Sequence, residues 1–147
     1  MKKMILLLFI SFGITQAQAK VFNKSDEQIF IKLMDGLFNA LVENDKAWLE
    51  SNLSDECTFN DPSGQSLSKA SLIQAFSEKG IYILESMKGV NIKYIMNDVD
   101  GSGFGNIEVD GQMSTPDIID VSGTYGIKTS FIKRDTGWKI NSITVTQ

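Results

Sequence analysis

The sequence predicts an α+β domain in which three helices lie on one face of a strongly bent antiparallel sheet. Two observations lead to this prediction. Apolar residues recur at helical spacing in the first half of the chain, and from Ile81 onward they alternate as residues of strands do. Because the helices precede most of the strands, and because the strands follow one another without intervening helices, the class is α+β.

The first helix is expected from Ser25 to Asn44. Ser25-Asp26-Glu27-Gln28 has the pattern of a capping box, in which Ser25 is the N-cap and Gln28 reaches back to it. Eight apolar residues then follow at helical spacing: Ile29, Phe30, Leu33, Met34, Leu37, Phe38, Leu41 and Val42. This wide apolar stripe indicates a helix that packs on the sheet.

Two shorter helices and one short strand come next. Asp45 caps a helix that ends before Ser54, and Ser68 caps another that Gly80 ends as the residue after the C-cap. Between these helices, Cys57–Asp61 alternates as a strand, so Phe59 and Asp61 are expected on the same face.

Three strands are expected between the last helix and the final hairpin: Ile81–Met87, Val90–Met96 and Phe104–Met113. The turn before the third covers Asp98–Gly103. This turn resembles an EF-hand calcium loop at its first positions, but Glu108 comes one residue too early for the bidentate position. A glycine-rich hairpin turn explains the stretch without a metal, and no metal is expected.

A final hairpin is expected over Val121–Gln147, turning at Asp135-Thr136-Gly137 with Gly137 in a bulge position. That register pairs Arg134 with Trp138, Ile132 with Ile140, Thr129 with Ile143 and Ile127 with Val145. One face then carries Val121, Tyr125, Ile127, Phe131, Ile143 and Val145, and the other carries Ile132, Trp138 and Ile140. The second group is covered either by a partner or by the chain's own residues.

The chain begins with a pattern typical of a signal peptide. Lys2 and Lys3 precede an apolar run, Met4–Ile14, and Ala17-Gln18-Ala19 is a small-x-small cleavage site. The run is too short to span a membrane. We therefore expect a signal peptide at 1–19, no membrane contact after its removal, and an exported domain at 20–147, periplasmic or secreted.

Composition excludes several classes of site. The chain has no histidine, which removes Ser-His-Asp triads, Cys-His pairs and imidazole ligands. Cys57 is the one cysteine, so no intrachain disulfide can form, and a buried apolar role is expected for it. A net charge of −4 argues against binding to nucleic acid. No cofactor is expected.

Several motifs together resemble the nuclear transport factor 2-like (NTF2-like) superfamily. They are Leu41-Val42-Glu43-Asn44-Asp45, Thr58-Phe59-Asn60-Asp61-Pro62-Ser63-Gly64, the helix capped by Ser68, and Phe131 to Ile140 in the final hairpin. The resemblance is to its polyketide cyclase-like (SnoaL-like) and exported bacterial branch. It implies a cystatin-like cone, in which a curved sheet wraps around the long first helix and encloses a pocket. It also implies that the domain can dimerise through the sheet, as such domains often do.

The resemblance also implies a site. Residues expected to line the pocket are Phe59, Asp61, Tyr82, Met87, Tyr94, Tyr125, Thr129 and Phe131. In ketosteroid isomerases, which are similar in fold, the Asp of an Asp-Pro-x-Gly turn is the general base, and Asp61-Pro62-Ser63-Gly64 matches that turn. Those enzymes also carry two oxyanion donors, a Tyr on the first helix and an acidic residue on a late strand. By spacing, these two positions fall near Leu37 and Thr129 in this sequence, so the matching donors are missing. The alternative is that Asp61 organises the turn through nearby backbone amides.

Three functions therefore remain open. The first is a non-catalytic exported domain that binds a small, largely apolar molecule in the cone or serves assembly. The second is an isomerase- or cyclase-type enzyme that uses Asp61 as a general base, with Thr129 or Tyr125 orienting the substrate. The third is an interaction module that forms a homodimer through the sheet face predicted to carry Trp138.

Overall fold

The computed structural model describes residues 24–147, which form three helices and seven strands. The helices are α2 (Lys24–Glu43), α3 (Lys46–Asn52) and α4 (Lys69–Ala75), and the strands are β1 (Leu53–Asn60), β2 (Ser66–Ser68), β3 (Tyr82–Met96), β4 (Asp100–Ser114), β5 (Ile118–Asp120), β6 (Gly123–Arg134) and β7 (Gly137–Thr146). The expected signal peptide, residues 1–19, lies outside the described residues. Within the described range, no helix has the length and apolar character to cross a membrane.

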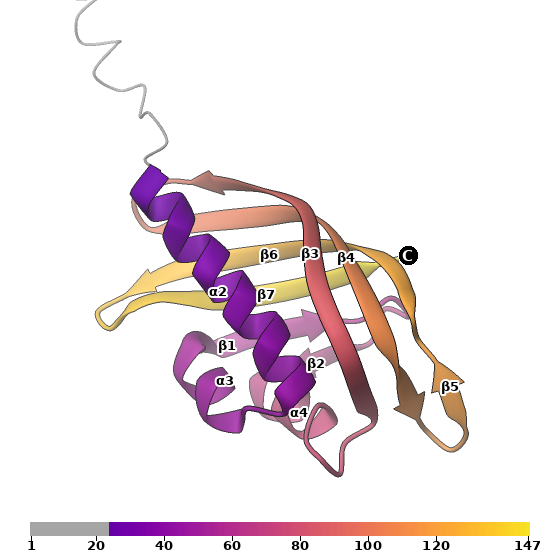
Figure 1. The fold of residues 1–147 in the computed structure, drawn as a ribbon. Helices are drawn as coiled ribbons and strands as arrows, with labels where there is room; N and C mark the ends of the chain where they lie inside the picture. The colour runs from indigo at the N-terminus through magenta and orange to yellow at the C-terminus, as the bar shows by residue number, and fades with distance from the viewer. Residues whose placement is uncertain (1–23) are drawn as a thin grey trace, which may run out of the picture.

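The seven strands form one curved sheet in the order β2-β1-β7-β6-β4-β3, and β5 pairs with β4. Helix α2 runs diagonally across the concave face, while α3 and α4 lie at the end that carries β1 and β2 (Figure 1). The sheet is mixed, because β1 pairs with β7 in parallel. The expectation of a purely antiparallel sheet was therefore wrong at this one pairing, which joins two strands that lie far apart in the sequence.

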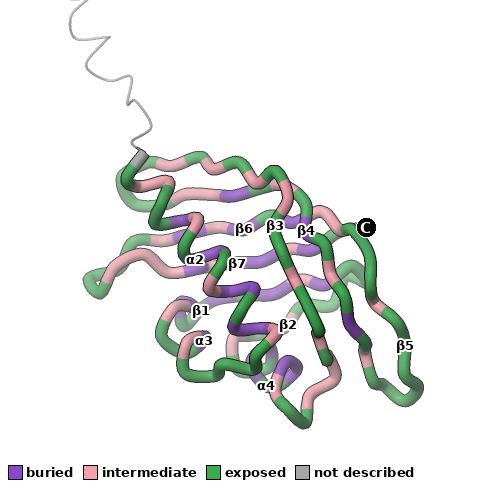
Figure 2. Tube along the Cα trace, in the orientation of Figure 1, coloured by how far each residue is buried: buried purple, intermediate pink, exposed green. Residues whose placement is uncertain are grey.

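The core lies between α2 and the concave face of the sheet. Figure 2 shows buried positions along one side of α2 and along the middle of β6 and β7. Phe30, Leu37, Phe131 and Ile140 are each at most 1 % exposed. The apolar stripe of α2 is thus the surface that the sheet covers, which is the main contribution to stability.

Two of the four helix boundaries predicted from caps are confirmed. The Asp45 side chain accepts a hydrogen bond of 3.0 Å from the Trp48 amide, and Ser68 accepts one of 3.3 Å from the Ser71 amide. Ser25 is not an N-cap, because α2 already includes Lys24. Gly80 does not end α4 either, since α4 stops at Ala75 with Phe76 as its C-cap.

Strand β3 joins the two segments that were expected as separate strands. Two bulges, at Glu85 and at Asn91-Ile92, shift its register with β4, and Asn91 has a φ of +53°. Bulges increase the local twist and bend a strand, so these two account for much of the curvature at this edge. The turn after β3 is shorter than expected: Asn97 accepts hydrogen bonds from the Val99 and Asp100 amides, and β4 already starts at Asp100.

The final hairpin has the expected pairing far from its turn and a different pairing close to it. Thr129 pairs with Ile143 and Ile127 with Val145, as predicted. Near the turn, however, Arg134 pairs with Gly137 and Lys133 with Trp138, because the extra residue is Asn141 rather than Gly137. Gly137 instead closes a two-residue turn with a φ of +112°, which favours glycine.

This shift moves Trp138 and Ile140 to the inner face of the sheet. Ile140 is fully buried, and the Trp138 ring meets Phe30 edge-on at a centroid distance of 5.0 Å. The predicted outer cluster of Ile132, Trp138 and Ile140 is therefore wrong, and Ile132 alone remains on the outer face, opposite Lys139. Phe30 of α2 contacts the Trp138 ring, and Ile140 is part of the hydrophobic core.

Candidate functional site

A cavity of about 710 Å³ lies between α2, the turn after β1 and the concave face of the sheet. Its walls are mostly apolar side chains from five elements: Leu37 and Leu41 of α2, Leu84 and Met87 of β3, Ile107, Val109 and Met113 of β4, Ile127 of β6, and Ile143 and Val145 of β7. Polar side chains gather near Asp61 and at the rim. A concave apolar space with a few polar groups is the usual form of a small-molecule site.

The structure places five of the eight predicted pocket residues in the cavity wall: Phe59, Asp61, Tyr82, Met87 and Tyr125. Ligand binding by these residues stays a prediction. Phe59 in β1 and Asp61, which directly follows the end of β1, both line the cavity, as the alternation predicted.

Tyr94, Thr129 and Phe131 do not line the cavity. They point inward from the sheet, but at the end where the Phe30 ring fills the space under α2. Phe30 stacks on Phe131 at a centroid distance of 4.2 Å and lies 6.0 Å from the Tyr94 ring. Thr129 is 1 % exposed and donates to the Gly103 carbonyl at 3.4 Å. An inward-facing position therefore did not distinguish core from cavity.

Asp61 organises the turn that follows β1. Its Oδ1 accepts hydrogen bonds from the Ser63 amide (2.9 Å), the Ser63 hydroxyl (2.6 Å) and the Gln65 amide (3.0 Å). Gly64 completes the turn with a φ of +87°. Asp61 thus has the turn-forming role considered above, and the same carboxylate also forms part of the cavity wall.

The second oxygen of this carboxylate, Oδ2, faces Tyr82. The Tyr82 hydroxyl donates to it across 3.5 Å, at the long limit of a hydrogen bond. Burial raises the pKa of Tyr82 above its ordinary value of 10, and the negative charge of Asp61 raises it further. Tyr82 therefore keeps its proton at neutral pH and acts as a donor inside the cavity.

Asp61 is 9 % exposed and has no cationic partner in the described structure. None of the ion pairs seen in residues 24–147 includes it, and no lysine or arginine of that range lines the cavity. Asp61 is thus the one charged side chain among the described residues that line the cavity, and three donors stabilise it at Oδ1.

Aromatic rings line the wall beside Asp61. Phe76 meets Phe59 edge-on at 6.0 Å and stacks on Tyr82 at 4.7 Å. Across the cavity, Tyr125 directs its hydroxyl to the Val121 carbonyl at 2.6 Å. Phe76, Ser63 and Gln65 were not predicted as site residues. Phe76 is an apolar residue at the C-terminal end of α4, and its apolar character does not distinguish a core residue from one that faces a cavity.

The positions where the ketosteroid isomerase resemblance would put oxyanion donors supply none. Leu37 lines the cavity with an apolar side chain, and the Thr129 hydroxyl is bonded to Gly103 away from it. The Ser63 hydroxyl and the Ser63 and Gln65 amides are already bonded to Asp61.

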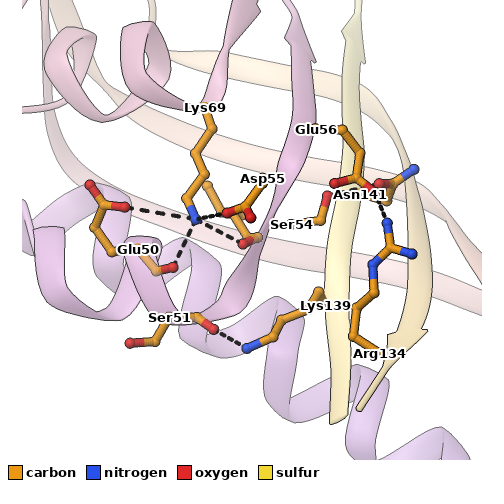
Figure 3. A network of polar contacts seen from close by, with 10 residues as sticks. Glu50, Ser51, Ser54, Asp55, Glu56, Lys69, Arg134, Lys139 and Asn141 are labelled. Carbon is orange, nitrogen blue, oxygen red and sulfur yellow. Dashed lines mark hydrogen bonds and ion pairs between the residues drawn. The ribbon is translucent and has the colours of Figure 1, made fainter. Parts of the chain in front are cut away.

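A separate polar network joins the end of α3 to β1 and β7 (Figure 3). The Lys69 ammonium donates to the backbone carbonyls of Glu50 (2.8 Å) and Leu53 (3.1 Å), and the Glu50 and Asp55 carboxylates lie within 3.7 Å. Lys139 donates to the Ser51 carbonyl, and Arg134 pairs with Glu56. Lys69 and Lys139 satisfy free carbonyls at the helix end, and Arg134 links β6 to β1, so the network has a structural role.

Neither of the other sequence features forms a site in the described region. Cys57 is buried, and burial raises the pKa of its thiol to about 12, which keeps it protonated. No group of three or more potential metal-ligating side chains occurs within residues 24–147, including the loop at Asp98.

A comparison with protein families finds no match, and one with curated protein sequences finds none either. Solved structures do match. An NTF2-like protein from Cytophaga hutchinsonii superposes with a TM-score of 0.74 at 22 % identity, over 85 % of this chain and 98 % of that one. A protein described as a putative Ca/calmodulin-dependent kinase II association domain, from Exiguobacterium sibiricum, gives 0.72 at 11 % identity, over 86 % and 96 %.

A Caulobacter vibrioides protein with a cystatin-like fold gives a TM-score of 0.66 at 14 % identity, over 80 % of this chain and 85 % of that one. These likenesses show that the chain has the NTF2-like fold, as its motifs predicted. At such identities they show the fold alone.

Proposed function

We propose that this NTF2-like chain is an exported domain that binds a small, largely apolar molecule in its cavity without transforming it. The observation behind the proposal is the 710 Å³ cavity, whose walls are apolar except around Asp61 and at the rim. Cavities of about 300–1,000 Å³ are typical of small-molecule sites.

The scarcity of free donors supports a non-catalytic role, since among the donors described above only the Tyr82 hydroxyl is loosely held, by its 3.5 Å contact with Asp61. Enolate or oxyanion chemistry needs preorganised donors aimed at the developing charge, and this is usually the largest catalytic contribution. The Ser63 and Gln65 donors already bond to Asp61, and Leu37 offers no donor at all. A binding site needs no such donors.

A blocking variant tests the proposal. Val109 lines the cavity from β4, so Val109→Trp should fill the space. Asn106→Trp is a matched control, because Asn106 is exposed on the opposite face of the same strand. Nile red, a neutral apolar dye, should bind wild type and Asn106→Trp alike and bind Val109→Trp at least ~10-fold more weakly. Equal binding to all three proteins would reject the cavity as the binding site.

Export is proposed from the sequence pattern of residues 1–19. Expression in a bacterial host followed by N-terminal sequencing of the soluble exported fraction should give a chain that starts at Lys20. A protein found only in the cytoplasm with Met1 intact would contradict it.

The enzyme alternative keeps one observation in its favour, which is that Asp61 Oδ2 faces the cavity beside a protonated Tyr82. An isomerase-type base would exchange the α-protons of a bound ketone. In D₂O, exchange of the α-protons of 2-decalone should be faster with the wild type than with Asp61→Asn if this alternative holds. Equal rates for the two proteins would reject it.

Assembly is the second candidate, because two of the matching structures are described as association domains, one of them as a putative one. On the outer face of the sheet, Phe104 is 42 % exposed and lies in register between Lys93 and Lys128. A homodimer that covers this face would bury Phe104. Sedimentation at micromolar concentration should then show a dimer that Phe104→Glu converts to a monomer, whereas a wild-type monomer would contradict this candidate.

A further inference from the structure

We infer that the molecule bound in this cavity carries a protonated amine, which pairs with Asp61 while its apolar body fills the rest of the space. The inference rests on the proposed function and specifies the chemical class of ligand. It follows from three properties of the wall around Asp61: its charge, its free hydrogen-bonding capacity and its aromatic rings.

The first property is an unpaired buried charge. Asp61 is 9 % exposed, it takes part in no ion pair of the described residues, and it is the one charged side chain among those that line the cavity. Removing a carboxylate from water is costly unless a cation or several donors compensate for the lost hydration. A ligand that brings a positive charge therefore gains more from this wall than a neutral ligand does.

The second property is the capacity left at Oδ2. An ionised carboxylate has about four acceptor positions. Oδ1 already accepts three hydrogen bonds, whereas Oδ2 accepts only the 3.5 Å contact from Tyr82. The three bonds at Oδ1 also hold the carboxylate in one orientation, so Oδ2 is a preorganised acceptor. An ammonium group has up to three donors and can use it.

The third property is the aromatic wall. Phe59, Phe76 and Tyr82 form a continuous series of rings beside the carboxylate, and Tyr125 also lines the cavity. The faces of aromatic rings attract cations, and the attraction is stronger where water is excluded. Aromatic rings next to a carboxylate are therefore a favourable surrounding for an ammonium group.

The same wall disfavours anionic ligands. A fatty acid or another carboxylate would place its charge in a space that already contains Asp61, with no lysine or arginine of the described chain on the walls to pair with it. The cavity should thus distinguish amphiphiles of identical shape by the charge of their polar group.

Three probes with one rigid apolar body test this inference: 1-adamantylamine, 1-adamantanol and 1-adamantanecarboxylate. At pH 7 they are cationic, neutral and anionic. Displacement of Nile red from the wild-type protein measures the affinity of each. We expect the amine to bind at least ~10-fold more tightly than the carboxylate, with the alcohol between them.

Asp61→Asn completes the test, because an amide keeps an acceptor oxygen for Ser63 and Gln65 but removes the charge. The amine should lose its preference in this variant, while Nile red binding confirms that the cavity is intact. If the wild type binds all three probes equally, or prefers the carboxylate, the inference is wrong and the proposed cavity function stands. If neither Nile red nor any probe binds the wild type, both are wrong.

Discussion

Replacing Phe30 by alanine should destabilise the domain strongly, because this ring connects α2 to the sheet. Phe30 is fully buried, stacks on Phe131 at 4.2 Å and meets Trp138 edge-on at 5.0 Å. Its ring also packs directly on the backbone of Gly101, where an added Cβ would come within 2.7 Å of it. Since strands cannot readily move into the vacated space, the cost should lie in the upper part of the usual range for Phe→Ala, about 4–5 kcal/mol.

Urea unfolding followed by far-UV circular dichroism measures this cost. Ile29→Ala is the control, since Ile29 neighbours Phe30 on α2 but is 38 % exposed, and it should change stability by less than about 1 kcal/mol. A Phe30→Ala protein that loses no more stability than the control would refute the packing described here.

Three further predictions concern single positions. Gly137→Ala should cost about 1–2 kcal/mol, because the φ of +112° disfavours a side chain although nothing lies within 4 Å of the new Cβ; an unchanged urea midpoint would contradict that turn. Lys69→Met should cost roughly 1–3 kcal/mol by removing the donor to the Glu50 and Leu53 carbonyls, whereas the exposed Lys79→Met should have little effect. Burial raises the pKa of Tyr94 to about 12. Between pH 10 and 12 the folded chain therefore holds a proton that the unfolded chain releases. The free energy of unfolding should then fall as the pH rises through this window. Comparison with Tyr94→Phe isolates this slope, and equal slopes would contradict the assignment.

Features of the fold set by neighbouring residues could be predicted from the sequence. The caps at Asp45 and Ser68 depend on contacts three residues away, and both are present. The parallel pairing of β1 with β7 has no local signal, because it joins Leu53 to Ile140 across most of the chain. The final hairpin lies between these cases. A one-residue bulge was expected and exists, but it lies at Asn141 rather than at the glycine of the turn.

The candidate site divides in the same way. Alternation placed Phe59 and Asp61 on one face correctly, since the period of a strand is a local property. Alternation could not show which inward-facing side chains meet a cavity. That depends on Phe30, whose ring fills the space under α2 beside Phe131 and Tyr94 but does not reach Met87 or Tyr125. A large residue of one helix thus sets the boundary between core and cavity.

The central claim is that a largely apolar molecule binds in the cavity between α2 and the concave face of the sheet. Methyl NMR tests this claim most directly. With isoleucine δ-methyl groups labelled, 1-adamantanol at saturating concentration should give intermolecular nuclear Overhauser effects to Ile107, Ile127 and Ile143, which line the cavity. Ile95 and Ile118, which are 60 % and 72 % exposed, should give none. Effects confined to these exposed isoleucines, with no effect at the three cavity methyl groups, would contradict the claim.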